Sequence, residues 1–290
     1  MIGRGCRRIL GIRIEGEYHW GYWVRVPGTS KQQSAFPLPP PTTLVGALSF
    51  PLARDGALKE TSTEGRFAGE TLIDIKNKNL NPRSAAAVFQ GAVLGAAISL
   101  SDRAIMWEDI NKYTTLHFQT TTKDKAEEKA AGGRRYLDKY KTGAIISGKV
   151  FYPKGKATLF YVIDEDAVAR AIHPPWERRL EEACWGISRI GSKESIFSVS
   201  KVKFFDLSKT EREKVKTKLY FPAGAGEVDF GEKFYKLTFW SGGWGKGERP
   251  VFSEYIVPGD RSLIVSEAIS VQVKCQAYEF GPQEVMLLEQ

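Results

Sequence analysis

The sequence predicts an α+β fold whose core elements run in the order strand, helix, two strands, helix, strand. Three stretches predict this order. Residues 9–15 alternate apolar and polar side chains, the segment FPLPPPTTLVGAL at residues 36–48 leads into a helix, and residues 145–207 hold two strands, a second helix and a last strand. This order of elements is that of a ferredoxin-like core.

The first strand is predicted over residues 9–15, ILGIRIE. Leu10, Ile12 and Ile14 fall on one face of such a strand, and glycine or charged residues fall on the other. The strand therefore has one buried face.

A proline-rich entry into a helix follows. Four prolines lie within residues 37–41, and because proline fixes φ and lacks a backbone N–H, this stretch is expected to run extended and outside any sheet. Thr42 or Thr43 then caps a helix of about residues 42–54, in which apolar side chains recur at helical spacing until Pro51 ends or kinks it.

A long apolar run occupies residues 85–100, AAAVFQGAVLGAAISL. It is interrupted by Gln90 and is shorter than the ~20 residues that span a bilayer. We predict a buried helix at about residues 84–100, capped by Ser84.

The stretch from residue 145 to residue 207 supplies the remaining core elements. Two strands over residues 145–163 are joined by a turn at residues 153–156, which predicts a hairpin. Pro174 and Pro175 then open a helix with one apolar face, and a last strand follows whose alternation changes phase between Val199 and Val202, which indicates a β-bulge. Residues 214–290 are rich in aromatic and β-branched types and are expected to be mostly strand.

Composition limits the class of protein. The chain has 290 residues, 42% of them hydrophobic and 26% charged, as in a globular protein, and a formal net charge of +8, which favours an anionic partner. Its three cysteines are far apart with no CxxC pair, which argues against a disulfide framework and a zinc knuckle and fits a reducing cytoplasm. The N-terminus has no apolar signal region, and we expect neither a membrane span nor a cofactor nor a metal.

Two polar segments are candidates for binding a nucleic acid. The insertion at residues 113–142 has seven basic and four acidic side chains, and in it Arg134, Arg135, Lys139 and Lys141 could meet phosphates while Tyr136 or Tyr140 stacks on a base. An ordinary solvated loop has the same composition.

The second segment is the loop RIGSKES at residues 189–195. Arg189 and Lys193 can meet phosphates, Gly191 lets the backbone approach closely, and the hydroxyls of Ser192 and Ser195 can donate to phosphate oxygens or base edges. The structural alternative is a glycine-terminated helix end with ordinary surface charges.

Three stretches in this order resemble one family. They are PLPPPTTLVGAL after the first strand, RRYLDKYKTGAIISGKVFY before the central strand, and GISRIGSKESIFSV after the second helix. Together they look like the Cas-five family of CRISPR-associated proteins, in the superfamily of repeat-associated RNA-binding proteins. The resemblance covers about residues 7–205, and the motifs favour the I-A or I-D branches.

The resemblance implies a modified ferredoxin-like fold of the RRM type with an inserted β-hairpin thumb. Residues 1–206 would form this RNA-binding core, with a basic thumb at about 113–142, and residues 207–290 a β-rich C-terminal extension. The protein would be a subunit of a type I CRISPR surveillance (Cascade) complex that caps the 5′ repeat-derived tag of the CRISPR RNA, with Thr42 and Thr43 facing the RNA. Its partners would be the backbone filament subunit and the large subunit, and target DNA only through the complex.

Two other functions are compatible with these residues. One is a metal-independent endoribonuclease that processes precursor CRISPR RNA, for which His117, Tyr113, Tyr136, Tyr140 and Lys141 are candidates. The other is a purely structural subunit whose basic face docks an acidic protein. The non-catalytic RNA binder is our preferred interpretation.

Overall fold

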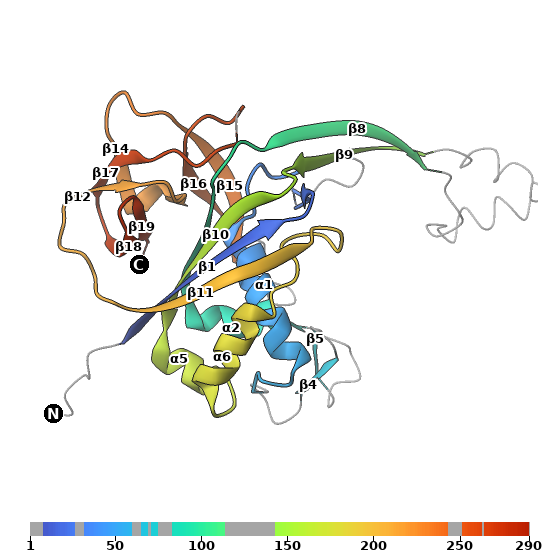
Figure 1. Ribbon diagram of the computed structural model, residues 1–290, viewed down its shortest axis with the longest axis vertical. Coiled ribbons are helices and arrows are strands. Elements are labelled where there is room, and N and C mark those ends of the chain that lie inside the picture. The colour runs from blue at the N-terminus through green and yellow to red at the C-terminus, as the bar shows by residue number, and fades with distance from the viewer. Residues whose placement is uncertain are drawn as a thin grey trace, which may run out of the picture.

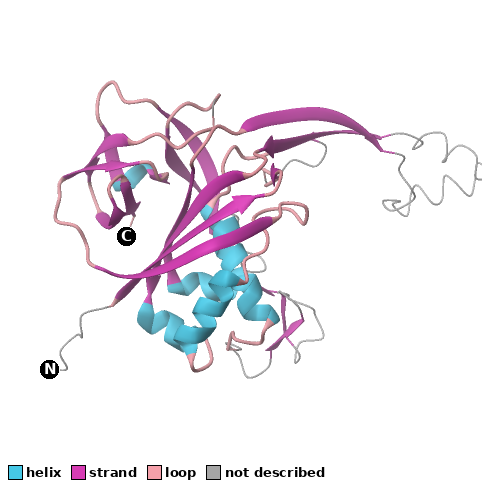
Figure 2. Ribbon diagram, viewed as in Figure 1, coloured by secondary structure: helices cyan, strands magenta, loops and turns pink. Residues whose placement is uncertain are grey.

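The computed structural model describes residues 8–26, 32–59, 65–68, 71–74, 83–113, 143–242, 251–262 and 264–289. It is a mixed α/β structure, in which mostly antiparallel sheets are accompanied by few helices (Figure 2). None of the helices in these ranges is long and apolar enough to cross a membrane.

A four-stranded sheet forms the centre of the molecule, with the strand order β11-β1-β10-β7. All neighbours in it are antiparallel. The bulge that the phase change predicts is confirmed, because Glu15 pairs with Lys201 whereas Gly16 pairs with Val199, which leaves Ser200 as the extra residue. The strands are β1 (Ile9–Tyr18), β7 (Val93–Leu100), β10 (Gly155–Asp164) and β11 (Phe197–Leu207).

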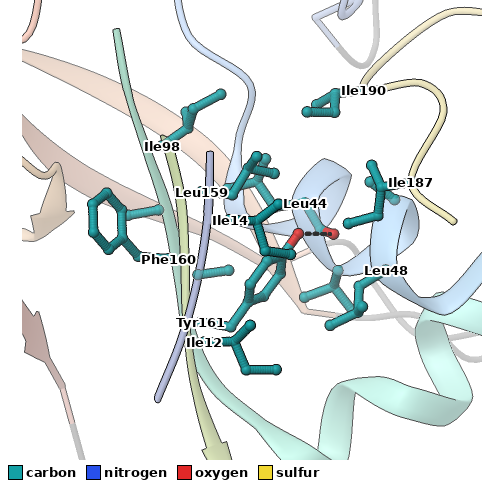
Figure 3. Packing of buried hydrophobic residues seen from close by; sticks show 14 of the residues in the cluster. Ile12, Ile14, Leu44, Leu48, Ile98, Leu159, Phe160, Tyr161, Ile187 and Ile190 are labelled. Carbon is teal, nitrogen blue, oxygen red and sulfur yellow. Dashed lines mark hydrogen bonds between the residues drawn. The ribbon is translucent and has the colours of Figure 1, made fainter. Parts of the chain in front are cut away.

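Helices cover one face of this sheet (Figure 1). Figure 3 shows the packing, in which Ile12 and Ile14 of β1 face Leu44 and Leu48 of α1, and the hydroxyl of Tyr161 donates to the carbonyl oxygen of Leu44 at 3.0 Å. The helices are α1 (Pro41–Arg54), α2 (Ala85–Phe89), the 3-10 turn η1 (Gln90–Ala92), α5 (Glu165–Ala171) and α6 (Trp176–Trp185).

The predicted helix after the prolines is present, but its capping differs from our expectation. Pro40 is the N-cap without a side-chain cap, and its carbonyl oxygen accepts the amides of Thr43 and Leu44 at 2.9 and 3.3 Å. Pro41 begins the helix and has no amide to satisfy, so a threonine cap is not needed. Thr42 lies in the first turn with Thr43, and Pro51 lies inside the helix instead of ending it.

The predicted helix at about residues 84–100 is wrong. Only α2 and η1 are helical there, and the second half of the run is strand β7. Helix α1 lies on one face of β7, and on the other a Cβ at Gly95 would be 2.3 Å from Leu288. A strand buried on both faces has a continuous apolar sequence, which periodicity alone does not distinguish from a buried helix.

For the predicted hairpin over residues 145–163, the turn and both strands are present, but the two strands do not pair with each other. The chain turns as predicted, with the amide of Gly155 donating to the carbonyl oxygen of Tyr152 at 3.0 Å. The strands on either side enter different sheets, however, because β10 pairs with β1 and β7, whereas β9 pairs with β8, β2 and β3. These strands are β2 (Gly21–Tyr22), β3 (Gln32–Gln33), β8 (Ile105–Tyr113) and β9 (Gly143–Phe151).

Strands β8 and β9 pair along their whole length and form a long ribbon that extends from the body (Figure 1). Residues 114–142 join the far ends of the two strands and lie outside the described residues. A small sheet with the order β4-β5-β6 lies between α1 and α2 in the sequence. Its strands are β4 (Gly65–Ala68), β5 (Thr71–Asp74) and β6 (Arg83–Ser84).

The C-terminal quarter is mostly strand, as predicted, and covers the face of the central sheet opposite the helices (Figure 1). A Cβ at Gly11 of β1 would be 2.9 Å from Phe280, whose ring also lies 5.3 Å from that of Phe160. The elements are β12 (Lys214–Thr217), β13 (Phe221–Pro222), η2 (Ala223–Ala225), β14 (Gly226–Val228), β15 (Phe234–Gly242), β16 (Val251–Pro258), β17 (Ile269–Val273), β18 (Gln276–Gly281) and β19 (Glu284–Leu288).

Candidate functional site

A hollow of about 530 Å³ lies where three separate segments of the chain meet. The segments are residues 23–25 after β2, one side of helix α1, and the loop between α6 and β11. Its lining residues are Trp23, Val24, Arg25, Thr43, Gly46, Ala47, Phe50, Ser188, Arg189, Gly191 and Ser192.

The loop of residues 189–195 is folded on itself and fixed to the segment after β2. The amide of Ile190 donates to the carbonyl oxygen of Ser195 at 3.1 Å, and the amide of Ser192 donates to that of Trp23 at 2.9 Å. In return, the amide of Trp23 donates to the hydroxyl oxygen of Ser195 at 3.0 Å. These bonds hold the loop in one conformation against the wall of the hollow.

Gly191 is required by this arrangement. Its φ is +109°, a value that L residues rarely adopt, and a Cβ at this position would lie 2.8 Å from the carbonyl oxygen of Trp23. From the sequence, Gly191 is expected to let the backbone approach a bound RNA closely. In the structure, the backbone that comes close to Gly191 is that of Trp23 in the same chain.

Arg189 projects from the loop toward helix α1. Its guanidinium carbon lies 4.7 Å from the ring centroid of Phe50, a cation–π contact. This contact places a permanent positive charge at the wall of the hollow, since arginine stays protonated.

Four of the predicted site residues lie together in the structure. Thr43, Arg189, Gly191 and Ser192 line the hollow. Thr42 lines a different hollow of about 350 Å³, between the start of α1 and the C-terminal strands.

Two further predicted residues belong to the loop but not to the lining. Lys193 is exposed beside the hollow. Ser195 is fully buried, and its hydroxyl lies 3.0 Å from that of Ser192, so it holds the loop together. The predicted residues of the insertion, Arg134, Arg135, Tyr136, Lys139 and Lys141, lie outside the described residues.

One acidic side chain lies at the edge of the loop. Hydrogen bonds from the Ser192 hydroxyl and from its own backbone amide, together with the charges of Lys149 and Lys193, hold the pKa of Glu194 below its usual value. Glu194 is therefore a carboxylate at neutral pH, and it balances part of the surrounding positive charge.

Sequence reasoning missed the aromatic residues next to the hollow on strands β8 and β9. The ring of Phe151 lies 5.9 Å from that of Trp107 and 6.1 Å from that of Trp20. No local pattern identifies this group, because only the pairing of β8 with β9 brings Trp107 beside Phe151.

The two described histidines, His19 and His173, form hydrogen bonds within the protein. A ring nitrogen of His19 lies 2.7 Å from the hydroxyl oxygen of Ser198, and the amide of His173 donates to the carbonyl oxygen of Ala57 at 2.8 Å. Neither residue lines the hollow. Within the described ranges, no three side chains of the metal-binding types gather at one place.

Comparison with known proteins identifies relatives along nearly the whole chain. The chain is 31% identical over 271 residues to the CRISPR system aCascade subunit Cas5 1 of Saccharolobus solfataricus, covering 92% of this chain and 95% of the relative. It is 24% identical over 216 residues to the CRISPR-associated protein Cas5 2 of the same organism, covering 73% of this chain and 68% of the relative.

Among solved structures, the crystal structure of a CRISPR protein from Archaeoglobus fulgidus has the same overall fold, with a TM-score of 0.54 and 19% identity. This similarity covers 97% of this chain and 99% of that protein. No protein-family model matches the chain.

Proposed function

The chain belongs to the Cas5 family of CRISPR-associated proteins, and from this premise we propose that it is a non-catalytic subunit of a Cascade-type effector complex that binds and caps the 5′ repeat-derived tag of the CRISPR RNA. A relative that matches 92% of the chain is named as such a subunit, which supports the assignment to the complex. The subtype, I-A or I-D, stays a prediction.

The observation that carries the RNA-binding role is the convergence of Thr43, Arg189, Gly191 and Ser192 on one hollow. Proteins bind the phosphates of a single-stranded RNA with cations and hydrogen-bond donors. Here Arg189 supplies a planar cation, and Thr43 and Ser192 in the same lining supply hydroxyl groups. Lys193 adds a second positive charge at the edge. In this proposal Thr42 and Ser195 support the site and do not contact the RNA.

We infer that the central sheet is the ferredoxin-like core of this family. The strand order β11-β1-β10-β7, with α1 following β1 and α6 preceding β11 in the sequence, supports the inference. On this basis the ribbon of β8 and β9 is the base of the thumb. Arg134, Arg135, Tyr136, Lys139 and Lys141, in the segment that joins these strands, are proposed to contact the tag as well.

We propose a binding role and not RNA cleavage. The described lining of the hollow offers cations and hydroxyls but no histidine or carboxylate, and the cleavage candidates His117, Tyr136, Tyr140 and Lys141 lie outside the described residues. Purified protein incubated with labelled repeat RNA in EDTA should leave the RNA intact. A discrete cleavage product would instead establish a metal-independent endoribonuclease.

The proposed protein partners are the backbone filament subunit and the large subunit, and target DNA is approached only through the complex. Crosslinking within the purified complex should yield RNA adducts on residues 189–195. Adducts to protein alone on this loop would instead favour the structural role, in which the basic face docks an acidic partner.

The RNA site can be tested by removing its two loop cations. Because a charged hydrogen bond contributes about 1.5–3 kcal/mol, the double variant Arg189→Ala, Lys193→Ala should bind tagged RNA at least ~10-fold more weakly, with a shallower dependence on salt. Fluorescence anisotropy at several salt concentrations measures both effects.

The matched control is the double variant Arg212→Ala, Lys236→Ala, in the loop before β12 and on β15, which removes two exposed cations that are paired with Glu279 and Glu254. It should bind RNA like the wild type. Unchanged RNA binding by the loop variant, or an equal loss in both variants, would refute the assigned site.

A further inference from the structure

The base of the β8–β9 ribbon carries apolar side chains on an exposed face. Ile105, Trp107 and Phe151 have relative exposures of 68%, 41% and 42%. Ile105 is paired with Phe151 and Trp107 with Lys149, so these side chains share one face of the ribbon, because residues two apart on a strand point the same way. Large apolar side chains gathered on a surface commonly mark a binding site.

The aromatic rings on this face hold one another in place. Phe151 lies between two indoles, with an interplanar angle of 66° to Trp20 and 71° to Trp107. Both contacts are edge-to-face, the geometry that aromatic pairs prefer. Trp20 is fixed further, because its indole N–H donates to the carbonyl oxygen of Glu194 in the loop beside the hollow. We call Trp20, Trp107 and Phe151 the aromatic platform.

A lysine connects the aromatic platform with the hollow. The ammonium nitrogen of Lys149 lies 6.0 Å from the ring centroid of Trp20 and 5.8 Å from that of Trp23. Trp23 lines the hollow, and Trp20 belongs to the platform. A positive charge therefore lies between the two surfaces, which together form one continuous strip.

We propose that the aromatic platform stacks one base of the single-stranded RNA whose phosphates occupy the hollow, with Lys149 meeting the phosphate between them; this rests on the RNA-binding role proposed above. Single-stranded nucleic acids bind where cations follow the backbone and aromatic faces receive the bases, and this strip has that composition. The continuity with the cationic hollow favours RNA over an apolar protein surface as the occupant.

The experiment measures the contribution of each base in the tag. Full-length protein is titrated with single-stranded RNAs of the tag sequence in which an abasic nucleotide replaces one position at a time. With the wild type, removal of one base should weaken binding about five- to hundredfold, the range that stacking on an aromatic side chain supplies. This readout needs no variant and does not depend on how a variant folds.

Variants then identify the platform as the stacking surface. In Trp107→Leu, which keeps an apolar side chain at an exposed position, the abasic RNA and the intact RNA should bind with the same affinity. The fluorescence of 2-aminopurine at that position should be quenched by the wild type and not by Trp107→Leu. Trp185→Leu, which changes an indole that is 50% exposed at the end of α6, is the matched control and should behave like the wild type.

Three results would overturn the inference. The first is that no base in the tag contributes to affinity, and the second is that the loss on removing a base is as large in Trp107→Leu as in the wild type. The third is that Trp107→Leu binds every RNA normally but is captured less well by another subunit of the complex, which would identify a protein interface. In all three the wild type binds RNA, whereas failure of the wild type to bind any tagged RNA would refute the proposed function itself.

Discussion

At the scale of single residues, buried tyrosines explain how the proline-rich entry to α1 is accommodated inside the protein. The hydroxyls of Tyr22 and Tyr220 donate to the carbonyl oxygens of Pro37 and Pro39, and that of Tyr161 donates to Leu44. Proline has no N–H that needs a partner, so a proline-rich segment can be buried outside a sheet once its carbonyl oxygens are satisfied. The prolines thus place α1 beside the hollow.

Gly191 offers a prediction at the same scale. Replacing it with alanine forces a side chain into a positive-φ conformation and against the carbonyl oxygen of Trp23, so Gly191→Ala should lower the free energy of unfolding by about 1–3 kcal/mol and weaken RNA binding. Thermal or urea unfolding measures the first effect and fluorescence anisotropy the second.

The matched control is Gly46→Ala, which also changes a glycine lining the hollow. A Cβ there would meet nothing within 4 Å, and the position is helical. The free energy of unfolding of this variant should therefore rise by about 0.5–1 kcal/mol. Equal effects of the two substitutions would show that the conformation of Gly191 is not what holds the loop.

At the scale of elements, an ion-pair cluster joins β1 to β19. The Nε and Nη2 atoms of Arg13 donate to the two carboxylate oxygens of Glu284 at 3.0 and 3.2 Å, and the ammonium group of Lys218 lies 3.0 Å from the same carboxylate. Glu284 is 8% exposed, and although its burial raises the pKa, the hydrogen bonds from Arg13 and Lys218 outweigh burial and hold the pKa below its usual value.

This cluster predicts an acid-sensitive contribution to stability. Because the pKa of Glu284 is lower in the folded than in the unfolded chain, its contribution is complete above the unfolded value of about 4.3 and disappears as the pH falls through the lower folded value. The free energy of unfolding of Glu284→Gln should be about 1–3 kcal/mol lower than that of the wild type at pH 7, and this difference should shrink toward pH 3. Urea unfolding at several pH values measures it.

Glu279→Gln is the control for this prediction. Glu279 lies on the neighbouring strand β18 and is paired with the exposed Arg212, so its loss should change stability by less than ~1 kcal/mol. A Glu284→Gln variant that is as stable as this control, or whose deficit does not depend on pH, would refute the role assigned to the cluster.

At the scale of the whole molecule, part of the C-terminal strands shares a hydrophobic core with the central sheet, and other C-terminal side chains form a second buried cluster of their own. Leu219, Phe239, Phe280 and Met286 belong to the same buried cluster as Ile12 and the other side chains of the central sheet. The division into a core of residues 1–206 and an extension of residues 207–290 stays a prediction. The shared core indicates that the two parts stabilise each other.

A substitution in β7 tests this mutual stabilisation. Gly95→Val places side-chain atoms against Leu288 and Met286, where even a Cβ would lie 2.3 and 2.8 Å from them, so it should lower the free energy of unfolding by about 1–3 kcal/mol. If the protein unfolds as one unit, circular dichroism and tryptophan fluorescence should report the same, lowered midpoint.

The control is Gly91→Val, at an exposed position where a Cβ would meet nothing within 4 Å. It should leave the midpoint nearly unchanged. Two separate transitions in Gly95→Val, only one of them shifted, would indicate that the C-terminal strands unfold independently of the central sheet.

The elements that sequence reasoning predicted correctly have local causes. Alternation identified β1, the prolines and the apolar spacing identified α1, and a phase change located the bulge at Ser200. The same reasoning missed α5. It also interpreted β7 as a helix, because a strand buried between α1 and β19 has no polar face that would reveal its two-residue period.

For the site, the amino-acid sequence by itself determined the chemistry of the loop 189–195 and of α1, and these share the hollow through Arg189, Gly191, Ser192 and Thr43. Only the tertiary structure decided that Thr42 faces elsewhere, that Ser195 is buried, and that Trp107 meets Phe151 beside Trp20. The physical reason is that residue type and spacing reflect local backbone preferences. Which distant side chains share a surface depends on strand pairing and packing between segments far apart in the sequence.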